Sequence, residues 1–245
     1  MQTSYFTAAL IVLLLQITGC SHTEAYSSTE QLDKELVVLA HGLGRSDTAM
    51  WRLATRLEQA GYKVCRLDYA SIGESVEAVL AQTSKQIDAC IQYAPKVHYV
   101  GHSLGGLVIR AYLQNNHVLP KESIGEVVLI GTPNKGSELA DHLSDSWLMQ
   151  LGGGISRALM TGSNSLGNRL EELDLNIGII AGTKSSSLTN DKFTGANDGL
   201  VSVESAKLKN MSDFIAIDVN HSQMRNNQEV ALQTIHFLQK TTFKH

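Results

Sequence analysis

The chain has 245 residues, of which 43% are hydrophobic and 18% are charged. This length suits one ordinary domain with a buried core, and the composition excludes general disorder. The 20 Lys and Arg against 24 Asp and Glu give a net charge of −4 without a basic stripe, which argues against nucleic acid as a partner.

The N-terminus has the features of an export signal. Residues 8–17 form an apolar run that is too short to span a bilayer and fits the hydrophobic region of a secretory signal. The Gly-Cys pair ending at Cys20 resembles the bacterial lipobox, in which cleavage before the cysteine precedes its acylation. We predict a lipoprotein signal over 1–19, a lipidated Cys20 and a tether over 20–35, on an outer-membrane lipoprotein that faces the periplasm. A plain cleaved signal and an uncleaved anchor are the alternatives, because no Lys or Arg precedes the apolar run.

Two further cysteines are consistent with an exported protein. Cys65 lies in a predicted strand and Cys90 in a predicted helix. An oxidising compartment permits a disulfide between them, and each equally fits a small buried core residue. Neither has the spacing of a metal ligand, and we predict no metal site and no cofactor.

After the tether, predicted strands and helices alternate. Continuous or alternating apolar runs predict strands at 36–40, 62–67, 97–100, 127–130, 177–181 and 214–219. Apolar residues at helical spacing predict helices at 50–57, 76–93, 104–113 and 229–239. This alternation implies parallel pairing and right-handed crossovers. We therefore predict one three-layer α/β domain over 36–245, with about six mostly parallel strands.

One segment, at about 134–175, departs from this alternation. Leu139, Leu143, Trp147 and Leu151 are spaced by four and predict one apolar helix face, which three glycines then interrupt. We interpret the segment as a helical cap inserted over the carboxyl ends of the strands. An ordinary excursion packed on the core is the alternative.

A nucleophile motif lies between the third predicted strand and the helix that follows it. Residues 101–105 read Gly-His-Ser-Leu-Gly, which matches G-x-S-x-G. On a strand-turn-helix this pattern indicates a nucleophile elbow, which projects the serine hydroxyl above the sheet at the positive end of the helix dipole. Ser103 is therefore the predicted nucleophile.

A base and an acid follow in the chain order that such an elbow requires. His221 comes directly after the last predicted strand and is the predicted base, since a serine hydroxyl needs one to become nucleophilic. Asp198, in an Asn-Asp-Gly turn after the fifth strand, is predicted to bond the far ring nitrogen of His221. Asp191 is a nearby competitor for this role. The other histidines considered lie in less suitable places: His98, His102, His142 and His236.

Residues 41–44 read His-Gly-Leu-Gly and follow the first predicted strand, where an oxyanion loop is expected. The backbone N–H groups of Leu43 and Leu104 are the predicted oxyanion donors. His41 is expected to brace the loop rather than transfer protons. We assign no role to Arg45 and Ser46.

These motifs together resemble a known family. The resemblance is to the bacterial lipase-like α/β-hydrolase family, with the class 2 lipases and the PGAP1-like esterases as the nearest groups. The segments that carry it are 41–46, 101–108, 131–137 and 197–201. It implies hydrolysis of carboxylic esters, often acyl lipids, with Ser103, Asp198 and His221 as the catalytic triad. Two early strands of the full fold are missing, so we expect a short version of it, and the calcium site of some bacterial lipases is not evident near Asp198.

The sequence therefore predicts a serine esterase or lipase that acts through an acyl-enzyme on lipid-like acyl esters. The predicted partners are this substrate and a membrane bound through Cys20, with no obligatory protein partner. An acyltransferase between envelope lipids with the same triad is one alternative. A non-catalytic binding lipoprotein is another, against which the complete set of nucleophile, base, acid and oxyanion loop argues.

Overall fold

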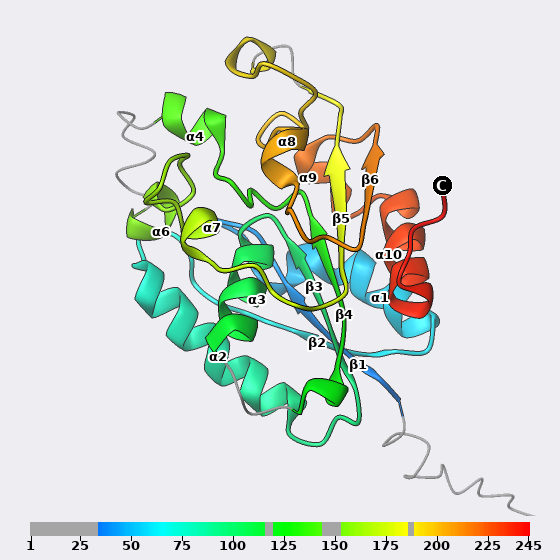
Figure 1. Cartoon of the computed structure of the whole chain (residues 1–245). Helices are drawn as coiled ribbons and strands as arrows, with labels where there is room; N and C mark the ends of the chain where they lie inside the picture. Colours follow the sequence, from blue (N-terminus) through cyan, green and yellow to red (C-terminus); the bar gives the residue numbers. More distant parts are fainter. Residues whose placement is uncertain (1–33, 116–119, 144–152, 186–188) are drawn as a thin grey trace, which may run out of the picture.

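The computed structural model describes residues 34–115, 120–143, 153–185 and 189–245. Within these residues six strands form one sheet in the order β2-β1-β3-β4-β5-β6, and every neighbouring pair is parallel (Figure 1). The strands are β1 (Leu36–Ala40), β2 (Lys63–Arg66), β3 (Val97–His102), β4 (Ile124–Ile130), β5 (Ile177–Gly182) and β6 (Asp213–Ile217). The predicted number and direction of the strands are confirmed.

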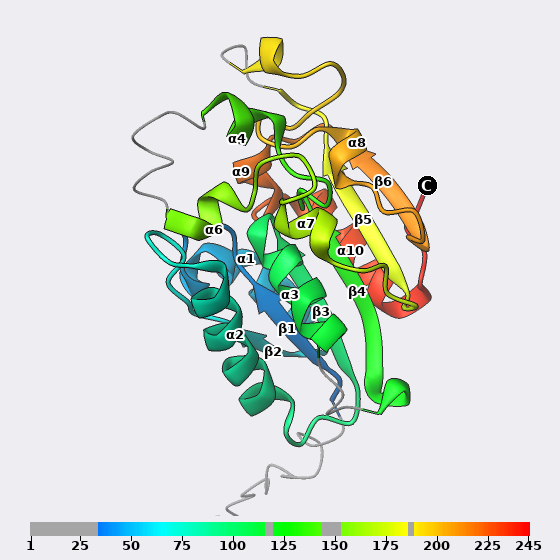
Figure 2. The same ribbon diagram turned by 60° about the vertical axis from the view of Figure 1, so that its left-hand side comes forward.

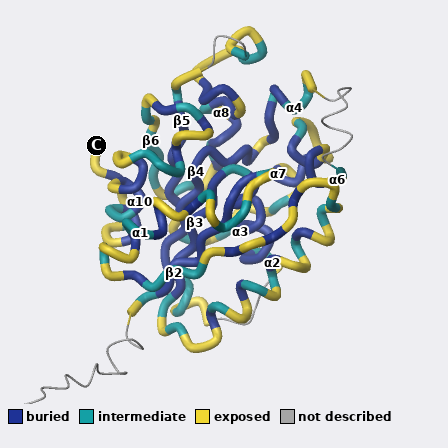
Figure 3. The backbone as a smooth tube through the Cα atoms, turned by 180° about the vertical axis from the view of Figure 1, so that it is seen from behind, coloured by how far each residue is buried: buried dark blue, intermediate teal, exposed yellow. Residues whose placement is uncertain are grey.

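Four longer helices cover the two faces of the sheet, as Figure 2 shows. They are α1 (Trp51–Gln59), α2 (Val76–Ile91), α3 (Leu104–Asn115) and α10 (Gln228–Lys240). Side chains of β1 alternate between the faces: Val37 packs in one core cluster with residues of α1 and α10, whereas Val38 packs in another with residues of α2 and α3. The inner strands β1, β3, β4 and β5 are consequently buried almost throughout, which explains their apolar runs, whereas the edge strands β2 and β6 are only partly buried (Figure 3).

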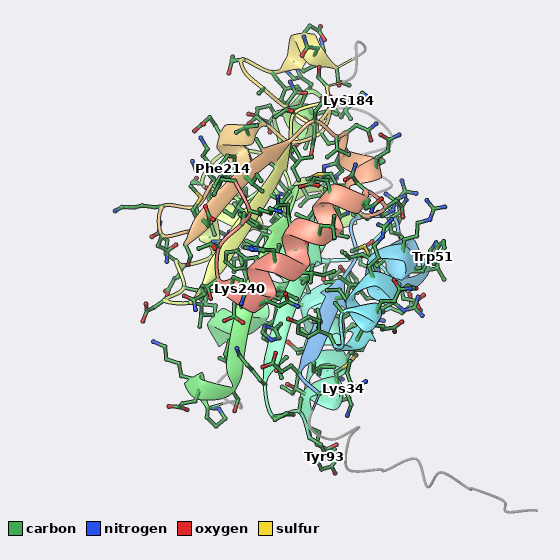
Figure 4. All side chains as sticks on the ribbon, turned by 90° about the vertical axis from the view of Figure 1, so that its right-hand side faces the viewer. Lys34, Trp51, Tyr93, Lys184, Phe214 and Lys240 are labelled. Atoms are coloured by element: carbon green, nitrogen blue, oxygen red, sulfur yellow. A yellow bond between two sulfur atoms is a disulfide. The ribbon has the colours of Figure 1, made fainter. Side chains whose placement is uncertain are left out.

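Helix α10 lies across the sheet beside α1, which brings the end of the chain back onto the first part of the fold (Figure 4). Its buried residues include Val230 and Phe237, which belong to the same cluster as Leu57 of α1. Trp51, by contrast, is 52% exposed at the start of α1. The helical faces therefore follow the predicted apolar spacing, with the tryptophan outside the core.

The register of the sheet places two site loops side by side. Ala40, the last residue of β1, pairs with Gly101 of β3. A Cβ atom added to Gly105 would lie 2.3 Å from the carbonyl oxygen of Ala40, so only glycine lets α3 start this close to β1. The loop after β1 is thereby held against the turn between β3 and α3.

The structure describes only part of the predicted cap between β4 and β5. Within the described residues it holds only short helices: α4 (Glu138–His142), α6 (Gly153–Arg157) and α7 (Leu166–Arg169). Helix α4 ends at His142, with Leu143 as its C-cap, so the predicted apolar face is not continued by this helix. Trp147 and Leu151, which were to complete that face, lie outside the described residues.

Several short helices were not predicted because each has too few residues to show a periodic pattern. They are η1 (Asp47–Met50), η2 (Lys121–Ser123), η3 (Asn190–Lys192), α8 (Val203–Ala206) and α9 (His221–Met224).

A disulfide joins Cys65 of β2 to Cys90 of α2, which resolves the question that the sequence left open. The predicted lipidation site Cys20 lies outside the described residues. In the described ranges no helix combines the length and the apolar character needed to cross a membrane.

Candidate active site

Ser103 lies in the tight turn between β3 and α3. Its φ is +57°, a left-handed conformation that is unusual for a residue with a side chain. The backbone N–H of Ser103 donates to the carbonyl oxygen of Ile130 at 2.9 Å, which ties the turn to the end of β4. These are the features of the predicted nucleophile elbow, and Leu104 begins α3 with its N–H in the first turn of the helix.

The loop after β1 lies directly against this turn. A Cβ atom added to Gly42 would be 3.1 Å from the Cβ of Ser103. Leu43 and Ser103 line the same pocket. The predicted oxyanion donors, on Leu43 and Leu104, thus flank Ser103 from two separate elements.

His41 braces the oxyanion loop after β1, the role that its position in the sequence suggested. It is fully buried, and its ring stacks on Tyr69 with 4.0 Å between ring centroids. The hydroxyl of Tyr69 donates to the carbonyl oxygen of His41, and a ring nitrogen, Nδ1, lies 2.9 Å from the carbonyl oxygen of Gly42. Burial lowers the pKa of His41, which favours the neutral ring.

Asp198 and His221 form a buried pair. Oδ2 of Asp198 lies 2.7 Å from Nδ1 of His221, and both residues are at most 6% exposed. The other oxygen, Oδ1, accepts the backbone N–H groups of Leu200 and Val201 at 2.9 and 2.8 Å. The carboxylate is therefore fixed in position, and its bond to Nδ1 leaves Nε2 of His221 as the ring nitrogen available to other groups.

Ser103 and His221 both line one pocket of about 220 Å³, and Asp198 lies behind the histidine. The structure thus brings together the three residues proposed from the sequence. Asp191, the competing acid, is instead exposed and pairs with Lys192 at 2.8 Å.

His102 makes a contact that the sequence did not reveal. Its Nε2 donates to the backbone carbonyl oxygen of His221 at 2.9 Å, since a carbonyl can only accept. Burial, followed by the nearby His221 ring, holds the pKa of His102 well below its usual range. A neutral His102 therefore holds the backbone at the start of α9, where His221 lies.

Two segments supply most of the apolar lining of the pocket. The segment after β4 contributes Leu139, Ala140, Leu143 and Leu159, and the loop of the acid contributes Leu200 and Val201. Ser202 donates its hydroxyl to Glu138 at 2.6 Å and so links these two walls. The arrangement can hold an apolar chain next to Ser103.

Among the described residues, no group of three or more His, Cys, Asp or Glu is placed to hold a metal ion. That the chemistry needs neither a metal ion nor a cofactor stays a prediction.

Known structures share this fold. Lipase BlEst2 from Bacillus licheniformis in its mature form superposes with a TM-score of 0.71 at 22% identity, over 86% of this chain and 93% of that chain. Phospholipase PlaB from Legionella pneumophila, in complex with thio-NAD, superposes with a TM-score of 0.66 at 15% identity, over 85% of this chain and 59% of that chain. A metagenomic carboxyl esterase, MGS0156, superposes with a TM-score of 0.58 at 17% identity, over 78% of this chain and 65% of that chain. At these identities the likeness shows the fold alone, which is that of an α/β hydrolase.

No curated protein sequence matches the chain. The family described as palmitoyl protein thioesterase matches residues 36–169, from β1 to the end of α7. The matched segment includes the oxyanion loop and Ser103, and it ends before Asp198 and His221. Because the match spans more than half of the chain, the protein belongs to the palmitoyl protein thioesterase family.

Proposed function

We propose that this protein is a serine hydrolase that cleaves carboxylic esters of long acyl chains through an acyl-enzyme. Family membership and the α/β-hydrolase fold support an ester hydrolase. The observation that carries the finer proposal is the buried Asp198–His221 pair, at 2.7 Å, in one pocket with Ser103.

In the proposed reaction His221 takes the proton of the Ser103 hydroxyl through Nε2 as the serine oxygen attacks the ester carbonyl. The N–H groups of Leu43 and Leu104 stabilise the oxyanion. The tetrahedral intermediate then breaks its carbon–oxygen bond, and the alcohol leaves with the proton from His221. Water repeats the sequence and releases the acid. Asp198 keeps His221 in the required tautomer throughout.

The apolar walls of the pocket support an acyl chain as the part of the substrate that is bound. Leu139, Leu159 and Val201 offer an apolar lining beside Ser103. Oxygen esters of lipids are the first candidate. Thioesters are the second, because the family description names a thioesterase. Comparing palmitoyl oxygen esters with palmitoyl thioesters of the same leaving-group size separates the two.

We also propose that the protein acts at the bacterial envelope, as an outer-membrane lipoprotein facing the periplasm and anchored through Cys20. The disulfide between Cys65 and Cys90 supports an oxidising compartment. Labelled palmitate incorporated into the full chain, and lost in Cys20→Ser, is the expected result. Equal labelling of both proteins would contradict this anchor.

The central experiment measures hydrolysis of p-nitrophenyl esters of increasing chain length by the full chain in neutral detergent, beside Ser103→Ala. We expect turnover that rises with chain length and is abolished by the substitution. Equal turnover in both proteins would exclude Ser103 as the nucleophile. Product analysis with a lipid alcohol present tests the acyltransferase alternative, since only a transferase forms the acylated acceptor in preference to free acid.

A further inference from the structure

Two arginines, Arg45 and Arg225, lie at the catalytic pocket, and the ester hydrolysis proposed above gives them no role. Arg45 directly follows the oxyanion loop of residues 41–44, and Arg225 is the C-cap of α9, the short helix that begins with His221. Both line the pocket that contains Ser103 and His221. Both also line an adjoining hollow together with Ser46 and Thr48. The two arginines therefore belong to the wall between the catalytic pocket and a polar hollow outside it.

This positive charge is not neutralised by the protein around it. No carboxylate lines either the pocket or the hollow in the described part of the chain. Asp47, two residues after Arg45, pairs with Arg66 at 3.3 Å instead. Burial, and then the charge of Arg45, lower the pKa of Arg225. An anion bound between the two arginines would relieve the repulsion of their like charges.

The contacts of Arg225 leave donors unused. Its Nη1 donates to the carbonyl oxygen of Ser222 at 2.6 Å, which fixes the side chain beside the loop of His221. Its Nε is buried and has no hydrogen-bond partner among the described residues. This donor is therefore available to a ligand with an acceptor oxygen.

The position of the arginines identifies which part of a substrate they would meet. The alcohol that leaves must receive its proton from His221, so it lies next to that residue. Ser222 and Arg225 follow His221 and line the pocket there, whereas the apolar side chains that suit an acyl chain come from the segment after β4. We therefore assign the side of the pocket with the arginines to the leaving alcohol and the apolar side to the acyl chain.

We propose that Arg45 and Arg225 form an anion subsite that binds a phosphate carried by the leaving alcohol, so that the preferred substrates are acyl esters of phosphorylated alcohols. This inference rests on the proposed ester hydrolysis and names its substrate class. Two guanidinium groups beside the hydroxyls of Ser46 and Thr48 suit the several acceptor oxygens of a phosphate. The reaction is unchanged: the acyl carbon–oxygen bond breaks, and the phosphorylated alcohol leaves with the proton from His221.

A matched pair of substrates tests the proposal. Palmitoylglycerol and palmitoylglycerol phosphate differ only in the phosphate, and both are presented to the full chain in micelles of a neutral detergent. We expect a higher kcat/KM for the phosphorylated ester. In Arg45→Gln/Arg225→Gln the ratio of the two kcat/KM values should fall by about 10- to 100-fold, the range for losing charge-assisted hydrogen bonds. Arg52→Gln, an exposed arginine on α1, is the control and should keep the ratio.

A binding measurement separates failure of the subsite from failure of the proposed function. Ser103→Ala is titrated with dodecyl phosphate, and the titration is repeated after adding the double substitution. Binding that depends on the arginines, without hydrolysis of any ester, would retain the subsite and overturn the ester hydrolase. Hydrolysis with an unchanged substrate ratio and no such binding would overturn the subsite alone.

A third arm distinguishes a phosphate in the subsite from a negatively charged micelle surface. Dodecyl phosphate added to the micelles should inhibit hydrolysis of palmitoylglycerol competitively. Dodecyl phosphate could instead activate that reaction equally in the wild type and the double variant. This result would attribute the preference for the phosphorylated ester to the charged micelle surface and contradict the proposal.

Discussion

Asp198 uses both carboxylate oxygens in different ways, and this division determines what its substitution would do. Oδ1 accepts two backbone N–H groups and so shapes its own loop, whereas Oδ2 faces Nδ1 of His221. An amide can keep the first set of bonds with its oxygen. Its NH₂ group would then face His221 and favour the wrong tautomer of the ring.

We therefore expect Asp198→Asn to lower kcat by about 10³- to 10⁴-fold while leaving the fold intact. The measurement is hydrolysis of a p-nitrophenyl ester, with the circular dichroism of both proteins compared. Asp191→Asn is the matched control, because Asp191 is exposed and pairs with Lys192. A comparable loss in that control, with Asp198→Asn active, would transfer the role to the competing acid.

At the residue scale, the proposed triad could be predicted because each member stands beside a strand end with a local pattern of its own. Ser103 lies in G-x-S-x-G, and Asp198 and His221 follow the last two strands. Arg225 has no such pattern, and its importance comes from a loop brought beside Arg45, 180 positions earlier in the numbering. The bond from His102 to the carbonyl oxygen of His221 is likewise a product of the three-dimensional arrangement.

At the scale of elements, α3 carries more than the nucleophile. Arg110, near its middle, is 2% exposed and reaches across to the segment after β4. Its Nη1 lies 3.0 Å from Oδ1 of Asn134 and 3.3 Å from the carbonyl oxygen of Gly167, and its Nη2 donates to the carbonyl oxygen of Leu170 at 3.1 Å. Burial lowers the pKa of Arg110 to about 10, which still leaves it charged at neutral pH. One guanidinium thus fastens the segment that walls the acyl side of the pocket.

Arg110→Lys should destabilise the protein by about 3 kcal/mol, because an ammonium group cannot reach these acceptors together and some stay buried without partners. We expect a lower midpoint in urea unfolding and faster limited proteolysis between β4 and β5. Arg157→Lys on α6 is the control, since Arg157 is exposed in the same segment. Equal stability of the two variants would show that Arg110 does not hold the segment between β4 and β5 in place.

The elements themselves differ in how far the sequence could define them. The sheet could be predicted because strands buried on both faces leave long apolar runs. Boundaries shifted where a strand continues into a polar or glycine residue, as in β4, which begins at Ile124 and contains Gly125 and Glu126. The segment after β4 could not be derived from periodicity, since its described helices α4, α6 and α7 have five residues or fewer, and α7 depends on contacts such as the one from Arg110 to Gly167.

For the whole molecule, buried histidines link stability to pH. His41 and His102 lie at the site end of the sheet, and burial lowers the pKa of both below 6.5. His98 is also buried and its pKa is lowered by burial, against the opposing effect of Glu35 and Glu126, which lie close to its ring. In the unfolded chain these rings would bind protons near their usual pKa, so below pH 6.5 the unfolded state gains protons that the folded state does not.

The free energy of unfolding should therefore be fully maintained above pH 6.5 and fall as the pH decreases below that value. The slope is about 1.4 kcal/mol per pH unit for each histidine that stays neutral in the fold. Urea unfolding at about pH 5 and about pH 8 measures it. In His102→Gln, whose amide can still donate to the carbonyl oxygen of His221, the loss on acidification should shrink by the share of one histidine. His142 is exposed, so His142→Gln is the control and should keep the wild-type slope. If His102→Gln also keeps the wild-type slope, His102 takes up its proton without unfolding of the protein.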